Sequence, residues 1–323
     1  MKKIILMLLV ICPTLFAQEN KDEIKKDVAK EPAKEQNKEP VKIAGKEAGK
    51  ELIETKIYFD PEAKTKVKNL ISYYKKNDVE IAHGPSKSFY ESGQVKQEIN
   101  FVEGLKEGIE TFYSPKGLKE HELIWNKGEL IKDIVYFTDG VIKAEVDLKT
   151  IDVKNPEEGK PDIKKQVKHG VEKLYFKNGR VYIQMQWADD EQNGLETKWY
   201  DNGKKKYELT WVKGKKEGIE TQWFKDGKVS SITNWIDNKA HGEMINYHEN
   251  GVKKDLLEWD RGVLVNERSS WNDKGELIAK CTNKNGSAFK GTVFDVERMM
   301  ILTFEDGRQV SSKVCDKNGK LLE

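Results

Sequence analysis

The chain has 323 residues, and its 57 basic and 55 acidic side chains leave a net charge of +2. This balance gives no reason to expect nucleic-acid binding, which usually shows as a basic patch or stripe. It also argues against strong electrostatic attraction to anionic lipid.

The first segment, Met1–Ala17, is typical of a secretory signal. Two lysines precede an apolar run that is too short to span a bilayer, and Leu15–Ala17 offers a cleavage site. Cys12 would suit a lipoprotein, but Ile11 stands where that processing needs a small residue. We therefore expect an exported protein (periplasmic, secreted or on the outer surface) whose signal is cleaved, with lipid anchoring as the alternative.

The next segment, Gln18–Lys56, is rich in Lys, Glu and Ala and has no aromatic residue, so it cannot build a core. We expect a solvated spacer that is disordered or partly helical. Residues 57–82 resemble a degenerate first repeat that caps an array, with Ala63 in a glycine position and Tyr73 and Tyr74 in an aromatic position. A short helix over Thr65–Lys75 is the alternative.

An internal repeat of 24 residues organises the chain between residues 83 and 275: Gly194–Trp211 reads GLETKWYDNGKKKYELTW, and Gly218–Trp235 reads GIETQWFKDGKVSSITNW. One series of positions, the hairpin glycines, comprises Gly93, Gly117, Gly140, Gly179, Gly203, Gly227, Gly251 and Gly275. All intervals between them are 23 or 24 residues except one of 39, which indicates an insert of 15 near Thr150–Lys168.

Three further series keep the same spacing. Four residues before each hairpin glycine stands an aromatic residue: Phe89, Tyr113, Tyr136, Tyr175, Trp199, Trp223, Tyr247 or Trp271. A second aromatic series comprises Phe101, Trp125, Trp187, Trp211, Trp235 and Trp259. A second glycine series, the leading glycines, comprises Gly84, Gly108, Gly170, Gly194, Gly218 and Gly242.

Each period is predicted to form one β-hairpin. Asn202-Gly203 and its counterparts are dipeptides that tolerate positive φ in tight turns, and the flanking residues alternate as strands do. One repeat cannot offset its backbone entropy alone, so neighbours must supply hydrogen bonds and apolar contacts. We expect an all-β, elongated array. Residues 276–323, with turns at Asp306-Gly307 and Asn318-Gly319, are interpreted as degenerate repeats that close its C-terminal end.

Two cysteines, Cys281 and Cys315, remain after removal of the signal. In an oxidising compartment they could form a disulfide, and two buried free thiols are the alternative. His83, His169 and His241 each precede a leading glycine and do not have zinc-ligand spacing, so we interpret them as structural. We expect neither a metal site nor a cofactor.

The tryptophans could stack a ligand, but their strict period favours packing against neighbouring repeats. No catalytic motif occurs in a fitting context, and the insert is too short and too charged to form a catalytic domain. We therefore expect a protein that is not an enzyme.

The segments Trp-Tyr-Asp-Asn-Gly (199–203) and Trp-Phe-Lys-Asp-Gly (223–227), the first of them followed by Trp-x-x-Gly-x-x-x-Gly (211–218), resemble the bacterial variant of the MORN repeat, and the chain looks similar to YwqK-type antitoxins. The resemblance covers about His83–Trp271. It implies stacked antiparallel hairpins and non-enzymatic roles in protein scaffolding, membrane association or toxin neutralisation. The apparent export signal departs from a cytoplasmic antitoxin.

Three binding functions follow as hypotheses. The first is an exported scaffold that holds another protein at the cell envelope. The second is an antitoxin or immunity protein whose partner is a toxin. The third is association with a lipid surface, which the near-neutral charge makes the weakest of the three. An enzyme would need a pocket with convergent polar groups.

Overall fold

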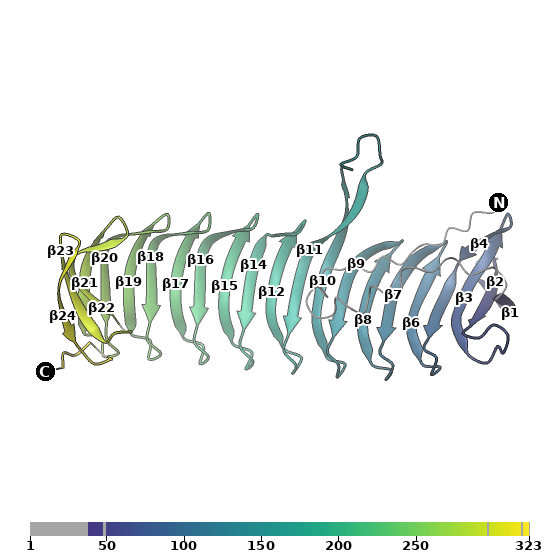
Figure 1. Ribbon diagram of the computed structural model, residues 1–323, viewed down its shortest axis with the longest axis horizontal. Helices are drawn as coiled ribbons and strands as arrows, with labels where there is room; N and C mark the ends of the chain where they lie inside the picture. Colours follow the sequence, from purple (N-terminus) through teal and green to yellow (C-terminus); the bar gives the residue numbers. More distant parts are fainter. Residues whose placement is uncertain (1–37, 48–49, 296, 318, 323) are drawn as a thin grey trace.

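A computed structural model describes residues 38–47, 50–295, 297–317 and 319–322. The predicted signal segment, Met1–Ala17, lies outside the described residues. Within them the regular elements are all strands, β1 to β24, and the strands lie side by side in one long row (Figure 1). Most strands pair antiparallel with the next one along the chain, as β16 with β17 and β17 with β18. The exceptions are the short strands β4 and β13, beyond which β5 pairs with β3 and β14 pairs with β12. The predicted all-β array of hairpins is confirmed.

The strands before the insert are β1 (Lys38–Glu47), β2 (Lys50–Tyr58), β3 (Val67–Lys76), β4 (Val79–Ala82), β5 (Gly84–Phe89), β6 (Val95–Val102), β7 (Leu105–Tyr113), β8 (Lys119–Asn126) and β9 (Glu129–Tyr136). The two strands that carry the insert are β10 (Ile142–Val153) and β11 (Ile163–Tyr175).

The strands after the insert are β12 (Val181–Ala188), β13 (Glu191–Gln192), β14 (Gly194–Trp199), β15 (Lys205–Val212), β16 (Lys215–Trp223), β17 (Val229–Ile236), β18 (Lys239–Tyr247), β19 (Lys253–Asp260) and β20 (Val263–Trp271). The C-terminal end is formed by β21 (Leu277–Lys284), β22 (Ser287–Asp295), β23 (Met300–Glu305) and β24 (Arg308–Val314).

The hairpin glycines close three-residue turns. In the turn between β14 and β15, Gly203 N donates to Tyr200 O at 2.9 Å, and Gly203 has a φ of 86°. Asn202 is absent from the residues with positive φ; its Oδ1 instead accepts from Lys204 N at 3.0 Å. The Asn-Gly pair therefore needs positive φ only at the glycine, and the strands shift register by one residue there.

Side chains of these turns also connect successive repeats. Asn202 Nδ2 donates to Lys225 O at 2.9 Å, and Asn250 Nδ2 donates to Asp273 O at 2.6 Å. Tyr200 donates from its hydroxyl to Trp223 O at 2.7 Å. These bonds join each turn to the one that follows 24 residues later, so the turns form a ladder along one edge of the row.

The opposite edge has two-residue turns with positive φ at both positions, as at Lys213-Gly214 and Asp237-Asn238. This is the type I′ geometry, whose twist matches that of the flanking strands. Asp306-Gly307 and Asn285-Gly286 adopt it as well, which places hairpins in the C-terminal segment as the sequence predicts.

The leading glycines mark a bulge inside a strand. Between β15 and β16, Glu208 pairs with Thr221 and Thr210 pairs with Glu217. The pairing therefore advances by four residues along β16 while it advances by two along β15. Gly218, with a φ of 75°, lies in that bulge. Bulges bend a strand and increase its twist, and the strands of the row are visibly curved (Figure 1).

The core is thin and is distributed along the length of the sheet. Leu209 and Val167 are fully buried, together with Leu130 and Val146. Polar side chains form much of the rest of the buried set, including Glu110, Glu122, Glu172, Glu196, Glu220, Thr197 and Thr233. A single sheet has no second layer to cover its apolar face, so each repeat depends on its neighbours for burial.

The insert forms an arm that rises out of the row (Figure 1). Strands β10 and β11 continue pairing beyond the neighbouring hairpins, out to Val153 and Ile163. Both of these side chains are exposed. The predicted position of the insert, near Thr150–Lys168, is therefore correct, and the insert is a lengthened hairpin.

The N-terminal end differs from the sequence prediction in two places. Strands β1 and β2 lie within the segment that we expected to be a spacer, because Ile53, Thr55 and Ile57 pair with β3, which supplies their backbone hydrogen bonds. Residues 65–75 contribute to strand β3 and form no helix, and Tyr73 and Tyr74 are buried there.

The first turn is also longer than the other hairpin turns: Phe59 N donates to Lys66 O at 3.0 Å, so six residues lie between the bonded pair, against three in the turn that contains Gly203. Lys64, with a φ of 51°, takes the conformation that we assigned to Ala63, and its N–H donates to Asp60 O at 3.0 Å.

Candidate binding site on the repeat sheet

A buried carboxylate recurs two residues after the leading glycine. The repeats that carry it have Glu110, Glu172, Glu196 and Glu220 in this position. Glu110 has no exposed surface, and Glu196 and Glu220 are 3% and 5% exposed. A buried charge is costly unless it is paired and hydrogen-bonded, so the partners of these carboxylates determine what the site can do.

A lysine and a tryptophan satisfy the carboxylate. Trp187 Nε1 donates to Glu172 Oε2 at 2.9 Å, and Lys168 Nζ donates to Oε1 at 2.7 Å. The ammonium group of Lys168 also lies 4.6 Å from the centre of the Trp187 ring. Each group of the three therefore contacts the other two. We call this arrangement the Lys–Glu–Trp cluster.

The same cluster occurs at Glu110, where Trp125 Nε1 donates at 2.7 Å and Lys106 Nζ at 2.8 Å. At Glu196 the lysine follows the carboxylate by two residues instead of preceding it by four: Lys198 Nζ lies 3.0 Å from Oε1, and Trp211 Nε1 donates at 2.8 Å. These carboxylates have all their strong partners inside the sheet. Such clusters hold the curved sheet together.

The cluster changes in the fourth repeat that carries it. Glu220 is paired with Lys216 Nζ at 3.2 Å and accepts from Gln222 Nε2 at 2.7 Å. Lys216 covers the Trp235 ring at 4.4 Å, yet Trp235 Nε1 is buried and has no hydrogen-bond partner.

In the next repeat the charged pair is absent. Ala240 stands in the lysine position and Met244 in the glutamate position, 24 residues after Lys216 and Glu220. Trp259 remains, and its buried Nε1 has no partner either. Exchange of a long lysine for alanine leaves space between the two indoles.

That space is a groove of about 390 Å³. We define the tryptophan groove by its lining residues, which are Glu220, Gln222, Thr233, Trp235, Asn238, Lys239, Ala240, Met244, Trp259 and Gly262. Its walls combine two aromatic rings and a methionine with a rim of Lys239 and Asn238. Grooves of this composition are typical of sites that accept an apolar group.

Exposed apolar side chains flank several of the type I′ turns: Val102, Leu105, Val212, Ile236 and Val263. Ile236 and Val263 flank the two turns that contribute Asn238 and Gly262 to the groove. Ile236 is 42% exposed and pairs with Lys239 on the groove rim. Exposed apolar side chains beside a groove are typical of an interaction site.

Tyrosine–glutamate pairs form a second repeated feature. The Tyr113 hydroxyl donates to Glu98 Oε1 at 2.6 Å, and the Tyr175 hydroxyl donates to Glu145 Oε1 at 2.8 Å. Burial raises the pKa of Tyr113 to about 12, and the hydrogen bond to Glu98 adds to this effect. The hydrogen bond from Tyr113 in turn lowers the pKa of Glu98. These groups keep one protonation state near neutral pH.

The predicted tryptophans are neither fully buried nor fully exposed. Trp187, Trp211, Trp235 and Trp259 belong to the cluster positions just described. Those next to the hairpin glycines lie under lysines: Lys205 Nζ is 5.8 Å from the Trp223 ring centre, and Lys253 Nζ is 5.6 Å from that of Trp271. Trp199 is half-buried as well. The contacts of these tryptophans lie within the sheet, and ligand stacking stays a prediction.

Cys281 and Cys315 are both buried and are both free thiols in this structure. Burial raises the pKa of the Cys315 thiol. Their pairing stays a prediction.

Of the predicted structural histidines, His169 and His241 contact acidic residues of the type I′ turns, Asp189 at 3.0 Å and Asp260 at 3.3 Å. His83 is buried beside Tyr74.

Among the described residues, no group of three or more His, Cys, Asp or Glu side chains could hold a metal ion. The described part of the chain likewise contains no helix that could span a membrane.

The buried glutamates and the groove were not identified from the sequence. An apolar-inward reading of the alternation after Gly218 would bury Ile219 and expose Glu220; the structure leaves Ile219 64% exposed and Glu220 5% exposed. The sequence pattern that marks the buried glutamates is Lys-x-Gly-x-Glu, which occurs at Lys106–Glu110, Lys168–Glu172 and Lys216–Glu220. Its loss at Ala240–Met244 marks the groove.

Comparison with known proteins agrees with this geometry. Residues 82–103, 168–189 and 192–213 match the family described as MORN repeat variant. All three segments have the same phase: each begins two residues before a leading glycine and ends in the next type I′ turn. A search of curated proteins finds no match.

Among solved structures, a chain of the Tc holotoxin pore of Photorhabdus luminescens is similar at 12% identity, with a TM-score of 0.17. The similarity covers 84% of this chain but only 16% of that one. The three matched segments begin and end at equivalent points of the hairpin repeats. The chain carries MORN repeat variants, arranged as hairpins in one extended sheet.

Proposed function

We propose that this chain is an exported, non-enzymatic scaffold that binds another protein at the cell envelope, and that the tryptophan groove is the anchor point for that partner. The observation that carries the proposal is the groove itself. It is the place where Trp235 Nε1 lacks the bond to a carboxylate that the earlier clusters make, and where the next repeat, with Ala240 and Met244, lacks the charged pair beside Trp259.

A partner side chain would complete this site. Interface hot spots are aromatic anchors in desolvated pockets surrounded by residues that exclude water. Trp235 and Trp259 supply the aromatic walls, which an apolar or aromatic group of the partner can contact. The exposed apolar side chains beside the groove extend the surface along the edge of the sheet. Export is supported by the character of Met1–Ala17.

The test restores the Lys–Glu–Trp cluster in the repeat that lacks its charged pair. The double variant Ala240→Lys, Met244→Glu restores the pattern of the preceding repeats, so it should fold, fill the groove and give Trp259 Nε1 an acceptor. We expect at least a tenfold loss of the partner recovered by in-cell crosslinking and mass spectrometry. The control introduces the same two charges on exposed positions of β24, as Gln309→Lys and Ser311→Glu.

Equal recovery of one partner by wild type and repaired protein would disprove the role of the groove. Fractionation of the same cells tests export: the mature protein should lack Met1–Ala17 and lie in the envelope or the medium. A cytosolic protein that retains this segment would contradict export. A partner that is toxic alone and harmless on co-expression would assign an immunity role within the same binding mechanism.

A further inference from the structure

Near the C-terminal end of the array, the repeat position that holds the buried carboxylate is occupied by a residue of opposite charge. At intervals of 24 residues it is occupied by Glu196, Glu220, Met244 and Arg268. Arg268 lies in β20 at the same kind of bulge, where Leu256 pairs with Ser269 and Glu258 with Val265. A guanidinium group thus stands where the earlier repeats bury a carboxylate.

The neighbours that compensate charge in the earlier repeats are also replaced. Leu264 stands in the lysine position and Asn283 in the tryptophan position. Within the described residues Arg268 has no ion pair, and its buried Nε has no hydrogen-bond partner. A buried donor without an acceptor costs free energy, which an external ligand could recover.

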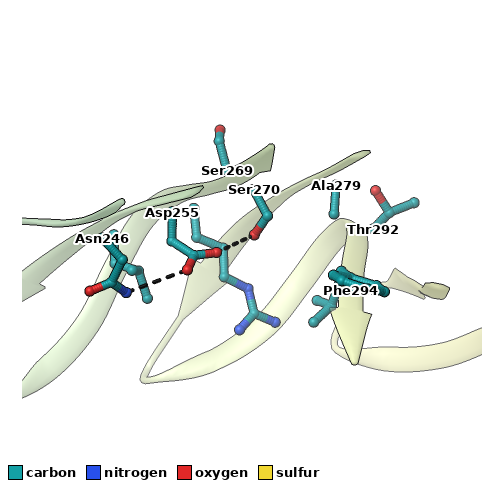
Figure 2. A pocket seen from close by; sticks show the side chains of 10 residues that line it. Asn246, Asp255, Ser269, Ser270, Ala279, Thr292 and Phe294 are labelled. Atoms are coloured by element: carbon teal, nitrogen blue, oxygen red, sulfur yellow. Dashed lines mark hydrogen bonds between the residues drawn. The ribbon is translucent and has the colours of Figure 1, made fainter. Parts of the chain in front are cut away.

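Arg268 lines a pocket of about 210 Å³ between β18 and β22. The same pocket holds Asp255, whose carboxylate accepts from Ser270 Oγ at 2.8 Å and from Asn246 Nδ2 at 3.4 Å. In Figure 2, Asp255 lies between Asn246 and Ser270, while Thr292 and Phe294 lie on the other side of the pocket. Asp255 is held in place by neutral partners, and no lysine or arginine is paired with it in the described part of the chain.

The rest of the lining is mixed: Leu257, Ala279, Val293 and Phe294 contribute apolar groups, and Ser269 and Thr292 contribute hydroxyls. The space corresponds to about seven water molecules, since a water takes roughly 30 Å³ in the liquid. It therefore fits a small molecule. One fixed positive and one fixed negative group, with apolar and hydroxyl groups beside them, define the ligand that this pocket can hold.

We propose that this pocket binds a small zwitterion of the apolar α-amino-acid class. Arg268 would hold the carboxylate through its guanidinium fork, and Asp255 would accept from the ammonium group. The apolar lining would contact the side chain. A simple anion would be opposed by Asp255, and a simple cation by Arg268. This inference is independent of the tryptophan groove, which lies on the preceding repeats.

Three probes of one carbon skeleton test the proposal with the purified full-length chain. L-valine carries both charges, isovalerate lacks the ammonium group and isobutylamine lacks the carboxylate. Calorimetric titration to about 10 mM covers the weak millimolar range expected for so small a ligand. We expect saturable binding of L-valine that is at least tenfold tighter than that of either single-charge probe.

The chain itself suggests variants that should fold. Arg268→Met copies Met244, and Asp255→Ser copies Ser231, which stands 24 residues earlier. We expect Arg268→Met to abolish binding of L-valine. Asp255→Ser should weaken the binding of L-valine at least tenfold and strengthen the binding of isovalerate, because it removes only the negative group of the pocket. Arg308→Gln, which removes an exposed arginine in β24, should bind like the wild type.

Several outcomes would overturn the proposal. Absence of saturable L-valine binding to the wild type would do so, as would isovalerate binding as tightly as L-valine. If Arg268→Met fails to fold by circular dichroism, Asp255→Ser still decides, because unchanged L-valine affinity in that variant is incompatible with a zwitterion site.

Discussion

A carboxylate that is nearly inaccessible to solvent is stable only with donors around it, and Glu196 has two strong ones. Trp211 Nε1 donates at 2.8 Å, and Lys198 Nζ lies at 3.0 Å. Glu196→Ala would leave the indole N–H without an acceptor and a lysine without its pair. We expect a loss of about 1–3 kcal/mol in the free energy of unfolding, measured by urea denaturation. Exposed Glu191→Ala should change it by less than about 0.5 kcal/mol. Equal effects of the two variants would refute the structural role of the cluster.

Gly291 is held by backbone on one side. It has a φ of 114°, and a Cβ there would lie 2.3 Å from Lys280 O. Gly275→Ala, where φ is 84° and the nearest atom is 3.7 Å away, carries only the left-handed strain of about 1–2 kcal/mol. Gly291→Ala adds overpacking of about 1–3 kcal/mol. The thermal midpoint should therefore fall further for Gly291→Ala, and equal midpoints would show that the close approach is unimportant.

At the scale of the hairpin, the arm is an addition to a complete repeat. Lys149 and Val167 pair at its base, in the place where other repeats begin their two-residue turn. Replacement of residues 150–166 by Asn-Gly restores the 24-residue period. The change removes the exposed ion pair of Lys165 with Asp190 and shortens a connection, two small and opposing effects. We expect unfolding free energy within about 1 kcal/mol of the wild type. A large loss would show that the arm supports its neighbours. As a control, Val167→Ala truncates a fully buried side chain at the arm base and should be clearly destabilising.

The hairpins could be predicted because their glycines recur. Gly93, Gly117, Gly179, Gly203, Gly227 and Gly251 all have positive φ in the turns assigned to them. Turn chemistry is local, so one sequence suffices to read it. Beyond Trp271 the aromatic positions of the repeat are no longer aromatic, but the turns still form.

Features that depend on strand neighbours could not be read in this way. The bulge at Gly218 depends on how β15 and β16 align, and it places Glu220 inside. Strands β1 and β2 form in a charged segment because β3 offers an edge. The tryptophan groove forms because two adjacent repeats differ in sequence. A search for a single repeated motif therefore does not find it.

The whole array should lose stability in acid. Burial would raise the pKa of Glu122 and Glu145, but hydrogen bonds from Lys119 and Tyr136, and from Lys173 and Tyr175, outweigh burial and lower both values below the ordinary 4.5. A carboxyl group whose pKa is lowered by folding stabilises the protein above its unfolded pKa. That contribution disappears as pH falls below about 4.5 and through the folded value.

The melting temperature should therefore decline as pH falls from 5 to 3, about the range in which these carboxylates titrate. Glu122→Gln should be less stable than the wild type at neutral pH, and the gap should narrow in acid. Glu191→Gln, at an exposed position, should follow the wild-type curve. A gap for Glu122→Gln that stays constant through this range would contradict the assignment.

Because each strand pairs with strands that lie near it along the chain, the row can assemble in the order of its synthesis. A segment that emerges first can complete its hydrogen bonds with residues that emerge soon after it, up to 30 positions later where Ala144 pairs with Leu174. The growing sheet always presents one fresh edge, and the next hairpin covers it. Such a chain can fold in one direction as it leaves a ribosome or a translocation channel, without waiting for its far end.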